Sequence, residues 1–244
     1  MKVLRFSDMG LGGAIARVTV VLRGTLLLGT LLLGALLMAA AARAADPSDL
    51  GVYLKNDRST DIQELLASHR LDPNKTIDKG MPILMQAVRD GAWKSFDVLF
   101  ANPRIELNAT NEYDETPLMY VALVGDVPRA KKMIVRGAQV NRLGWTPLHY
   151  ASAKGQTEMV KLLLANDAMP NAPSPEGDSP LMTAIGSNNL EVVQVLINAG
   201  ADPVARNLAG VDAIDIANQK GNKALAKALE KVVADRRAKD RKAQ

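Results

Sequence analysis

One motif recurs along the chain at a nearly constant spacing, and this periodicity constrains the fold more than any other feature. A Thr-Pro-Leu triplet starts at Thr116 and again at Thr146, 30 residues later. Related triplets start at Ser179 and Asp212, after two steps of 33 residues, and a degenerate copy, Met81-Pro82-Ile83, lies upstream. Such periods are typical of solenoids, whose units bury too little core alone and are stabilised by stacking on their neighbours.

Two further series of residues repeat with the same steps. A turn-forming residue follows nine positions after the start of each of the four later triplets, with a further one upstream, and a mostly apolar pair follows later in each unit. The turn-forming residues are Gly91 (upstream), Gly125, Gly155, Asn188 and Gly221. The pairs start at Leu65, Val98, Lys132, Leu162, Val195 and Ala228. Both series contain a 30-residue step at the same place as the triplets. The three repeating series therefore agree on the position of one shortened unit.

Signals within one unit predict two short helices. Thr146 is suited to cap a helix that Pro147 opens, and Gly155 ends it. The second helix has apolar residues spaced to form one buried face, at Met159, Leu162 and Leu163. In the next unit, Gly200 is suited to end the second helix in a left-handed conformation.

These residues resemble the ankyrin repeat, whose period is about 33 residues and whose signature is T-P-L-H-x-A. The residues that carry the signature are Thr116, Pro117, Thr146, Pro147, Leu148, His149, Gly155, Pro180 and Gly200. The resemblance extends over about residues 47–232. It implies an all-α solenoid of stacked helix-turn-helix units with short hairpin turns.

The registers also predict the boundaries of the units. We expect an N-terminal capping unit at 47–77, repeats at 78–112, 113–142, 143–175 and 176–208, a C-terminal capping unit at 209–232, and a charged tail at 233–244. The repeat at 113–142 is the shortened one. For the tail, a solvated helix end is favoured over a basic contact surface.

The first 44 residues, called the leader below, predict a secretory signal peptide. Basic residues precede 19 uncharged, mostly apolar residues from Gly24 to Ala42, and the small-residue pattern Ala42-Arg43-Ala44 follows. We expect cleavage after Ala44 or Ala45; a start of translation at Met9 would shorten the basic segment. The alternative is an uncleaved helix, because 19 residues just span a bilayer. In both cases the rest of the chain is exported, most simply to a bacterial periplasm.

Charge and cysteine content exclude several classes of protein. The chain has a net charge of +4, but the leader holds five basic residues and one acidic residue, so the remainder is neutral. A nucleic-acid partner is therefore disfavoured. The chain has no cysteine, which excludes a disulfide scaffold, a Cys-ligated metal site, a thiol nucleophile and a lipid-anchored cysteine.

Few residues are suited to catalysis, and we expect neither an enzyme nor a cofactor or metal site. The resemblance implies that His149 bonds across to the adjacent turn, and His69 lies at the end of a capping helix. Neither has a second ligand at metal-binding spacing. The turn carboxylates Asp114 and Glu115 keep a hydrolase open as a minor alternative. Most methionines match helix-core positions, at Met81, Met85, Met119, Met133, Met159 and Met182.

The resemblance implies that another protein binds at the turn tips and on the concave face of the first helices. The family pattern places exposed, variable positions at Met81, Gln86, Arg89, Asp90, Glu115, Tyr120, Leu123, Val124, Trp145, Tyr150, Ala153, Lys154, Asp178, Thr183, Gly186 and Ser187. Aromatic residues gather in the shortened repeat and the one after it, where exposed Trp and Tyr are typical anchors. The candidate partner-binding residues are Tyr113, Glu115, Tyr120, Trp145, Tyr150, Lys154 and Asp178. The alternative is that the tyrosines pack between neighbouring first helices and Trp145 fills the notch left by the shortened turn.

The resulting hypothesis is an exported, monomeric, non-enzymatic binding module. Its partner would be a periplasmic protein, and the module would be an accessory, inhibitor or immunity partner of a secreted enzyme. A membrane-tethered scaffold that retains its leader is the alternative, and in that case the leader is the module's only contact with the membrane.

Overall fold

The computed structural model describes residues 44–243, so the predicted signal peptide lies outside the described residues except for Ala44. From Pro47 onward the chain forms one compact unit. Its helices are η1 (Pro47–Asp49), α2 (Leu50–Lys55), α3 (Ser59–Ala67), η2 (Asp78–Gly80), α4 (Ile83–Arg89), α5 (Trp93–Ala101), α6 (Pro117–Val124), α7 (Val127–Val135), α8 (Pro147–Ala153), α9 (Thr157–Leu164), α10 (Pro180–Ile185), α11 (Leu190–Asn198), α12 (Ala213–Gln219) and α13 (Lys223–Ala243). The strands β1 (Thr76–Ile77) and β2 (Met81–Pro82) pair antiparallel, with Ile77 opposite Met81.

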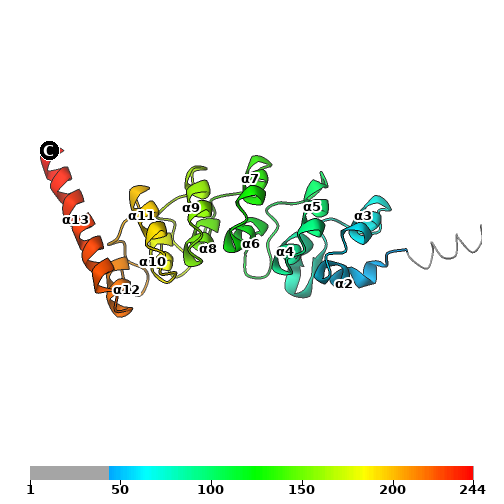
Figure 1. The fold of residues 1–244 in the computed structure, drawn as a ribbon, viewed down its shortest axis with the longest axis horizontal. Helices are drawn as coiled ribbons and strands as arrows, with labels where there is room; N and C mark the ends of the chain where they lie inside the picture. Colours follow the sequence, from blue (N-terminus) through cyan, green and yellow to red (C-terminus); the bar gives the residue numbers. More distant parts are fainter. Residues whose placement is uncertain (1–43, 244) are drawn as a thin grey trace, which may run out of the picture. The chain divides into compact units, whose positions relative to one another are not determined.

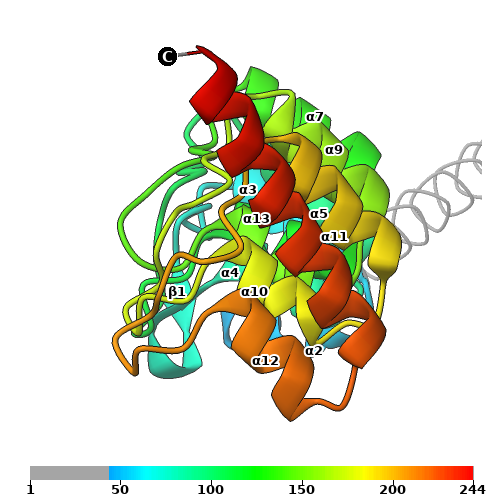
Figure 2. The ribbon, with the colours of Figure 1, turned by 90° about the vertical axis from the view of Figure 1, so that its left-hand side faces the viewer.

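The helices form two rows, as Figures 1 and 2 show. The first helix of each pair lies in the inner row, where α4, α6, α8, α10 and α12 contact one another in sequence order. The second helices lie in the outer row, from α3 to α11. This arrangement confirms the predicted all-α solenoid.

Each inner helix of the central units begins where the triplet predicts. Thr116, Thr146, Ser179 and Asp212 are extended N-cap residues. The backbone N–H of each donates to the side chain three residues later; at Thr146 the acceptor is His149 Nδ1, at 3.2 Å. The cap therefore satisfies a backbone donor that the helix leaves without a partner.

The turn-forming residues that follow the triplets adopt a left-handed backbone conformation. Gly125 and Gly155 have φ of 80° and 68°, and Asn188 has φ of 56° at the equivalent position. At Gly155 a side chain would also meet Asn189, because an added Cβ would lie 3.1 Å from that residue's Cβ. Glycine is therefore required there for both conformation and space, and asparagine is the residue that replaces it at least cost.

The core lies between the two rows and is mainly aliphatic. All six repeat-core methionines are buried, which confirms their predicted packing role: Met81, Met85, Met119, Met133, Met159 and Met182. Met81 and Gln86 were also predicted as exposed, variable positions, and that prediction is wrong, since each is only 6% exposed. The β1–β2 hairpin places Met81 at the start of α4, so this first repeat buries positions that the family pattern leaves open.

Four asparagines connect each turn to the next: Asn74, Asn108, Asn141 and Asn171. Asn141 illustrates the pattern, because its Nδ2 donates to the carbonyl of Asp167 at 2.6 Å and its Oδ1 accepts from the N–H of Met169 at 2.9 Å. The other three make the same pair of bonds, to Arg104 and Glu106, to Gly137 and Gln139, and to Gly200 and Asp202. This series repeats with the period of the units, including the 30-residue step, and the sequence analysis did not identify it.

The last helix does not end at the predicted boundary between capping unit and tail. α13 continues through residue 232 to Ala243. Arg236, within the predicted tail, is half-buried and donates to the carbonyls of Ile197 and Ala201, at 2.8 Å each. Within residues 44–243, no helix combines the length and apolar character needed to span a bilayer.

We predict that Asn141→Ala lowers the free energy of unfolding by about 1–3 kcal/mol, because two inter-turn hydrogen bonds are lost, each worth about 0.5–1.5 kcal/mol. Urea denaturation followed by circular dichroism measures the change. Asn166→Ala is the matched control, since its side chain donates to the carbonyl of Leu162, in the helix that directly precedes it, and makes no bond to another unit within residues 44–243. Equal losses of unfolding free energy in the two variants would show that the inter-turn hydrogen bonds stabilise the fold no more than a local bond does.

We predict that protonation of His149 opposes folding at acidic pH. This imidazole is fully buried, its Nε2 donates to the carbonyl of Asp178 at 3.0 Å, and its Nδ1 accepts from Thr146. Burial lowers the pKa of His149 in the folded chain. The unfolded imidazole titrates near pH 6.5, so the unfolded state binds more protons as the pH falls below that value and stability is lost.

The measurement is the free energy of unfolding from pH 7.5 down to pH 5.5, in the wild type and in His149→Gln. The wild type should show an additional loss of up to about 1.4 kcal/mol per pH unit below pH 6.5, relative to the variant. Parallel pH profiles would contradict this role of His149.

Candidate functional site

Glu115 joins two neighbouring units on the inner row. It lies in the turn before α6, and its carboxylate accepts three hydrogen bonds. Tyr120 of α6 donates to Oε2 at 2.9 Å, Asn111 donates to the same oxygen at 2.7 Å, and Tyr150 of α8 donates to Oε1. The structure thus brings together three of the predicted binding residues: Glu115, Tyr120 and Tyr150.

The tyrosine hydroxyls are held in these bonds. Burial, followed by the hydrogen bond to Glu115, raises the pKa of Tyr120 to about 12. The same two causes raise the pKa of Tyr150 well above its ordinary value. Both hydroxyls therefore stay protonated at neutral pH and donate to Glu115, so an incoming partner meets their rings rather than free hydroxyl donors.

Trp145 completes an aromatic cluster beside these tyrosines. Its ring stands edge-on to Tyr150, with centroids 6.2 Å apart, and edge-on to His149, at 5.3 Å. A pocket of about 230 Å³ lies here, lined by Leu123, Trp145, His149, Tyr150 and Ala153. It is smaller than the roughly 300–1,000 Å³ of pockets for drug-sized ligands. Its size and apolar lining suit an aliphatic or aromatic side chain of another protein.

The family pattern predicted most of this lining. Leu123, Trp145, Tyr150 and Ala153 are at predicted exposed positions, and all four line the pocket. The structure combines the two alternatives for Trp145 and Tyr150, which are half-buried and also line an open pocket. Tyr120 is half-buried as well, but it does not line the pocket.

The remaining predicted binding residues lie outside the pocket lining. Tyr113 is at a turn tip and is 62% exposed, and Lys154 is exposed at the end of α8. Asp178 is half-buried, and its carboxylate accepts from Asn207 at 2.7 Å. Asp178 thus links two turns of the solenoid.

The shortened turn is closely tied to its neighbours. Arg142 donates to the carbonyl of Asp114, and Leu143 at the tip is 96% exposed. Leu143 and Asn111 were not among the predicted binding residues, and the amide of Asn111 orients Glu115. Leu143 was detectable only as an apolar residue in a short polar turn, and no sequence signal identified Asn111.

The two turn carboxylates have different surroundings. Asp114 is exposed, with Oδ1 3.9 Å from Arg142 Nη2, whereas Glu115 bonds to the tyrosines. Within residues 44–243, no group of three or more His, Cys, Asp or Glu side chains is arranged to hold a metal ion.

Comparison with known proteins gives the family of this chain. The family model described as "Ankyrin repeats (3 copies)" matches residues 84–174 and 118–207. A putative ankyrin repeat protein of Rickettsia felis is 28% identical over 141 residues, which cover 54% of this chain and 49% of that protein. The tyrosine-protein kinase Shark of Drosophila melanogaster is 29% identical over 161 residues, 64% of this chain and 17% of the kinase.

An ANK repeat-containing protein of Caenorhabditis elegans is 29% identical over 114 residues, 39% of this chain and 19% of that protein. The match thus spans less than half the length of each of these relatives. The family model extends from residue 84 to residue 207, just over half of the 244 residues. Ankyrin repeats indicate a protein–protein interaction module, and the chain belongs to the ankyrin-repeat family.

Proposed function

We propose that this chain is an exported interaction module with no catalytic activity of its own, which binds a periplasmic protein through its turn tips and inner helix face. It would serve as an accessory, inhibitor or immunity partner of a secreted enzyme. The observation that carries the proposal is the apolar pocket beside Trp145, whose Tyr150 wall is fixed by Glu115.

The pocket has the features of an interface centre. Binding energy in protein interfaces is concentrated in a few Trp, Tyr and Arg residues at well-packed, central positions. Trp145 and Tyr150 are such residues, and the bond to Glu115 holds Tyr150 in place before a partner arrives. A fixed side chain loses little conformational entropy on binding, which favours affinity.

Export is proposed from the leader alone, which combines basic residues, an apolar segment and a small-residue cleavage pattern. The 19 uncharged residues from Gly24 to Ala42 also support the alternative of a membrane-tethered scaffold. N-terminal sequencing of the mature protein separates the two, since a start at Ala45 or Asp46 excludes the tether.

We predict that Trp145→Ala abolishes partner capture, because the variant removes one wall of the pocket. The measurement is crosslinked pull-down of the tagged protein from the periplasm, with captured proteins identified by mass spectrometry. A loss of about 30-fold or more is expected for an anchor worth at least 2 kcal/mol.

Trp93→Ala is the matched control. Trp93 is also half-buried, but it lies on the outer row beside Arg129, whose guanidinium is 4.8 Å from the ring centroid. Melting curves establish that both variants are folded. Full capture by Trp145→Ala, or loss in Trp93→Ala alone, would place the interface elsewhere.

We predict that Glu115→Gln lowers the pKa of Tyr120 and Tyr150 and weakens partner capture. The carboxylate raises both pKa values through its hydrogen bonds and its charge, so a neutral amide removes part of this effect. Ultraviolet absorbance titration should show phenolate formation at lower pH in the variant. Unchanged titration curves would show that Glu115 does not hold the tyrosines.

A further inference from the structure

The last helix differs from every other helix of the outer row. α13 has 21 residues, whereas α3, α5, α7, α9 and α11 have eight or nine. At 1.5 Å per residue α13 is about 30 Å long. Its first turns contact α12, with Leu225, Ala226 and Leu229 buried, and the helix then extends away from the stack (Figures 1 and 2).

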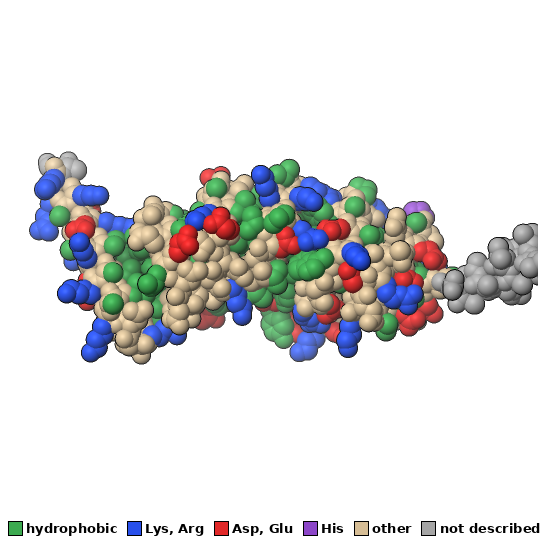
Figure 3. Space-filling model, viewed as in Figure 1, with side chains coloured by type: hydrophobic (Ala, Val, Ile, Leu, Met, Phe, Trp, Pro, Cys, Tyr) green, Lys and Arg blue, Asp and Glu red, His purple; other side chains and the backbone are tan. Residues whose placement is uncertain are grey.

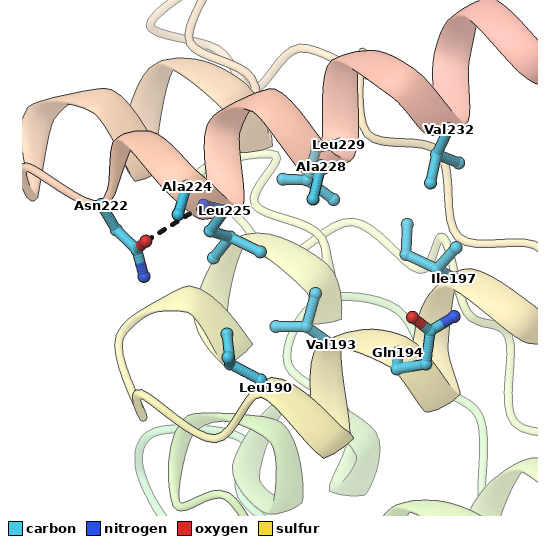
Figure 4. Close-up of a pocket in the computed structure, with 10 residues that line it drawn as sticks. All are labelled: Leu190, Val193, Gln194, Ile197, Asn222, Ala224, Leu225, Ala228, Leu229 and Val232. Carbon is cyan, nitrogen blue, oxygen red and sulfur yellow. Dashed lines mark hydrogen bonds between the residues drawn. The ribbon is translucent and has the colours of Figure 1, made fainter.

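An open groove lies between α11 and the first half of α13. Figure 4 shows its lining side chains, which come from both helices. The groove has a volume of about 250 Å³ and is lined by Leu190, Val193, Gln194, Ile197, Asn222, Ala224, Leu225, Ala228, Leu229 and Val232. Ala224 and Ala228 are exposed at its edge, so their small side chains leave space beside the aliphatic ones.

Arg236 fixes the distal end of the groove. Its guanidinium donates to the carbonyls of Ile197, in the last turn of α11, and Ala201. Both acceptors lie at the C-terminal end of α11, where a cation is favoured by the helix dipole. Arg236 therefore connects the two walls beyond the groove.

The α13 wall carries a large excess of positive charge. Lys223–Ala243 contains eight basic and three acidic residues. No basic side chain of α13 forms an ion pair within residues 44–243, whereas Arg129, Arg142 and Lys161 of the central repeats do. Helical periodicity places Lys231, Asp235 and Lys239 in line with Ala228, and Figure 3 shows basic side chains along α13 beside an apolar patch.

We propose that the α11–α13 groove docks an acidic amphipathic helix of a second protein. The apolar face of that helix would occupy the groove, and its carboxylates would pair with Lys231 and Lys239. The charge of α13 selects this occupant, because a groove that is apolar at its base and cationic along one edge is complementary to an apolar face flanked by acids.

The same observations disfavour other occupants. Docking of a second copy of this chain would bring two basic α13 helices together, and their like charges would oppose it. A lipid bilayer requires large apolar side chains on the exposed face, and within the described part of α13 Leu225 and Leu229 are buried. This docking surface is on the outer row, so it is independent of the Trp145 pocket.

The experiment is selection of displayed random peptides on the leaderless protein, with counter-selection on Ala228→Trp, whose indole fills the groove. Ala224→Trp provides a second blocked variant, and melting curves establish that both are folded. We expect the enriched peptides to combine apolar residues at i, i+3, i+4 and i+7 with net negative charge. Fluorescence anisotropy should show at least tenfold weaker binding of these peptides to both blocked variants.

Paired charge reversals test the role of the cations. Lys231→Glu with Lys239→Glu changes the groove edge, and Lys223→Glu with Arg237→Glu makes the same charge change on the opposite face of the helix. We expect about a tenfold loss of peptide affinity, or 1.4 kcal/mol, in the first pair. The second pair should lose much less.

Several results would overturn the proposal. One is the absence of any peptide that prefers the wild type to the blocked variants, and another is enrichment of peptides without acidic residues. Equal losses of peptide affinity in the two double variants would indicate that the net charge of α13 attracts acidic peptides without a specific docking site. Binding to phosphatidylglycerol vesicles that disappears in Ala228→Trp, without a groove-dependent peptide, would instead assign the groove to lipid.

Discussion

Each turn of this solenoid is bound to the next through one asparagine side chain, and this connection links the neighbouring units over residues 47–208. An amide supplies both a donor and an acceptor, so one residue satisfies a carbonyl and an N–H of the following turn. Because a helix pair buries too little apolar surface to fold alone, the spacing between units must be set by contacts between them. The asparagines set it at the turns, and the aliphatic core sets it between the helices.

The candidate binding site is a consequence of this spacing. Glu115 and Tyr150 are 35 residues apart in sequence, yet they bond because consecutive inner helices lie side by side. His149 bonds across the next boundary, to the carbonyl of Asp178. The same stacking that stabilises the fold thus fixes the aromatic wall of the pocket. Stability and binding therefore share these residues.

The parts of the structure that follow from local signals were predictable from sequence. Thr146 and Pro147 begin a helix and Gly155 ends it wherever the chain places them, so the unit boundaries could be derived from spacing. The bonds made by Asn141 and Glu115 could not be derived, because they depend on distances between units. For the tail a solvated helix end was predicted, and α13 continues to Ala243. The bonds of Arg236 to the carbonyls of Ile197 and Ala201 could not be derived, because they too depend on distances between units.

Burial in the first repeat shows a further limit of the family pattern. Met81 and Gln86 occupy positions that the pattern leaves open, and both are buried, Met81 in strand β2 and Gln86 in α4. A pattern averaged over central repeats does not describe a unit next to a cap. The pocket residues Leu123 and Ala153, in contrast, belong to central units and line the surface that the pattern assigns to them.

A partner protein bound at the pocket beside Trp145 should be captured there by photo-crosslinking. A benzophenone amino acid is placed at Ala153, on the pocket wall, or at Lys131, exposed on the outer helix α7. After irradiation of intact cells, we expect a discrete covalent adduct from position 153 and none from position 131. An adduct formed only from position 131 would contradict it.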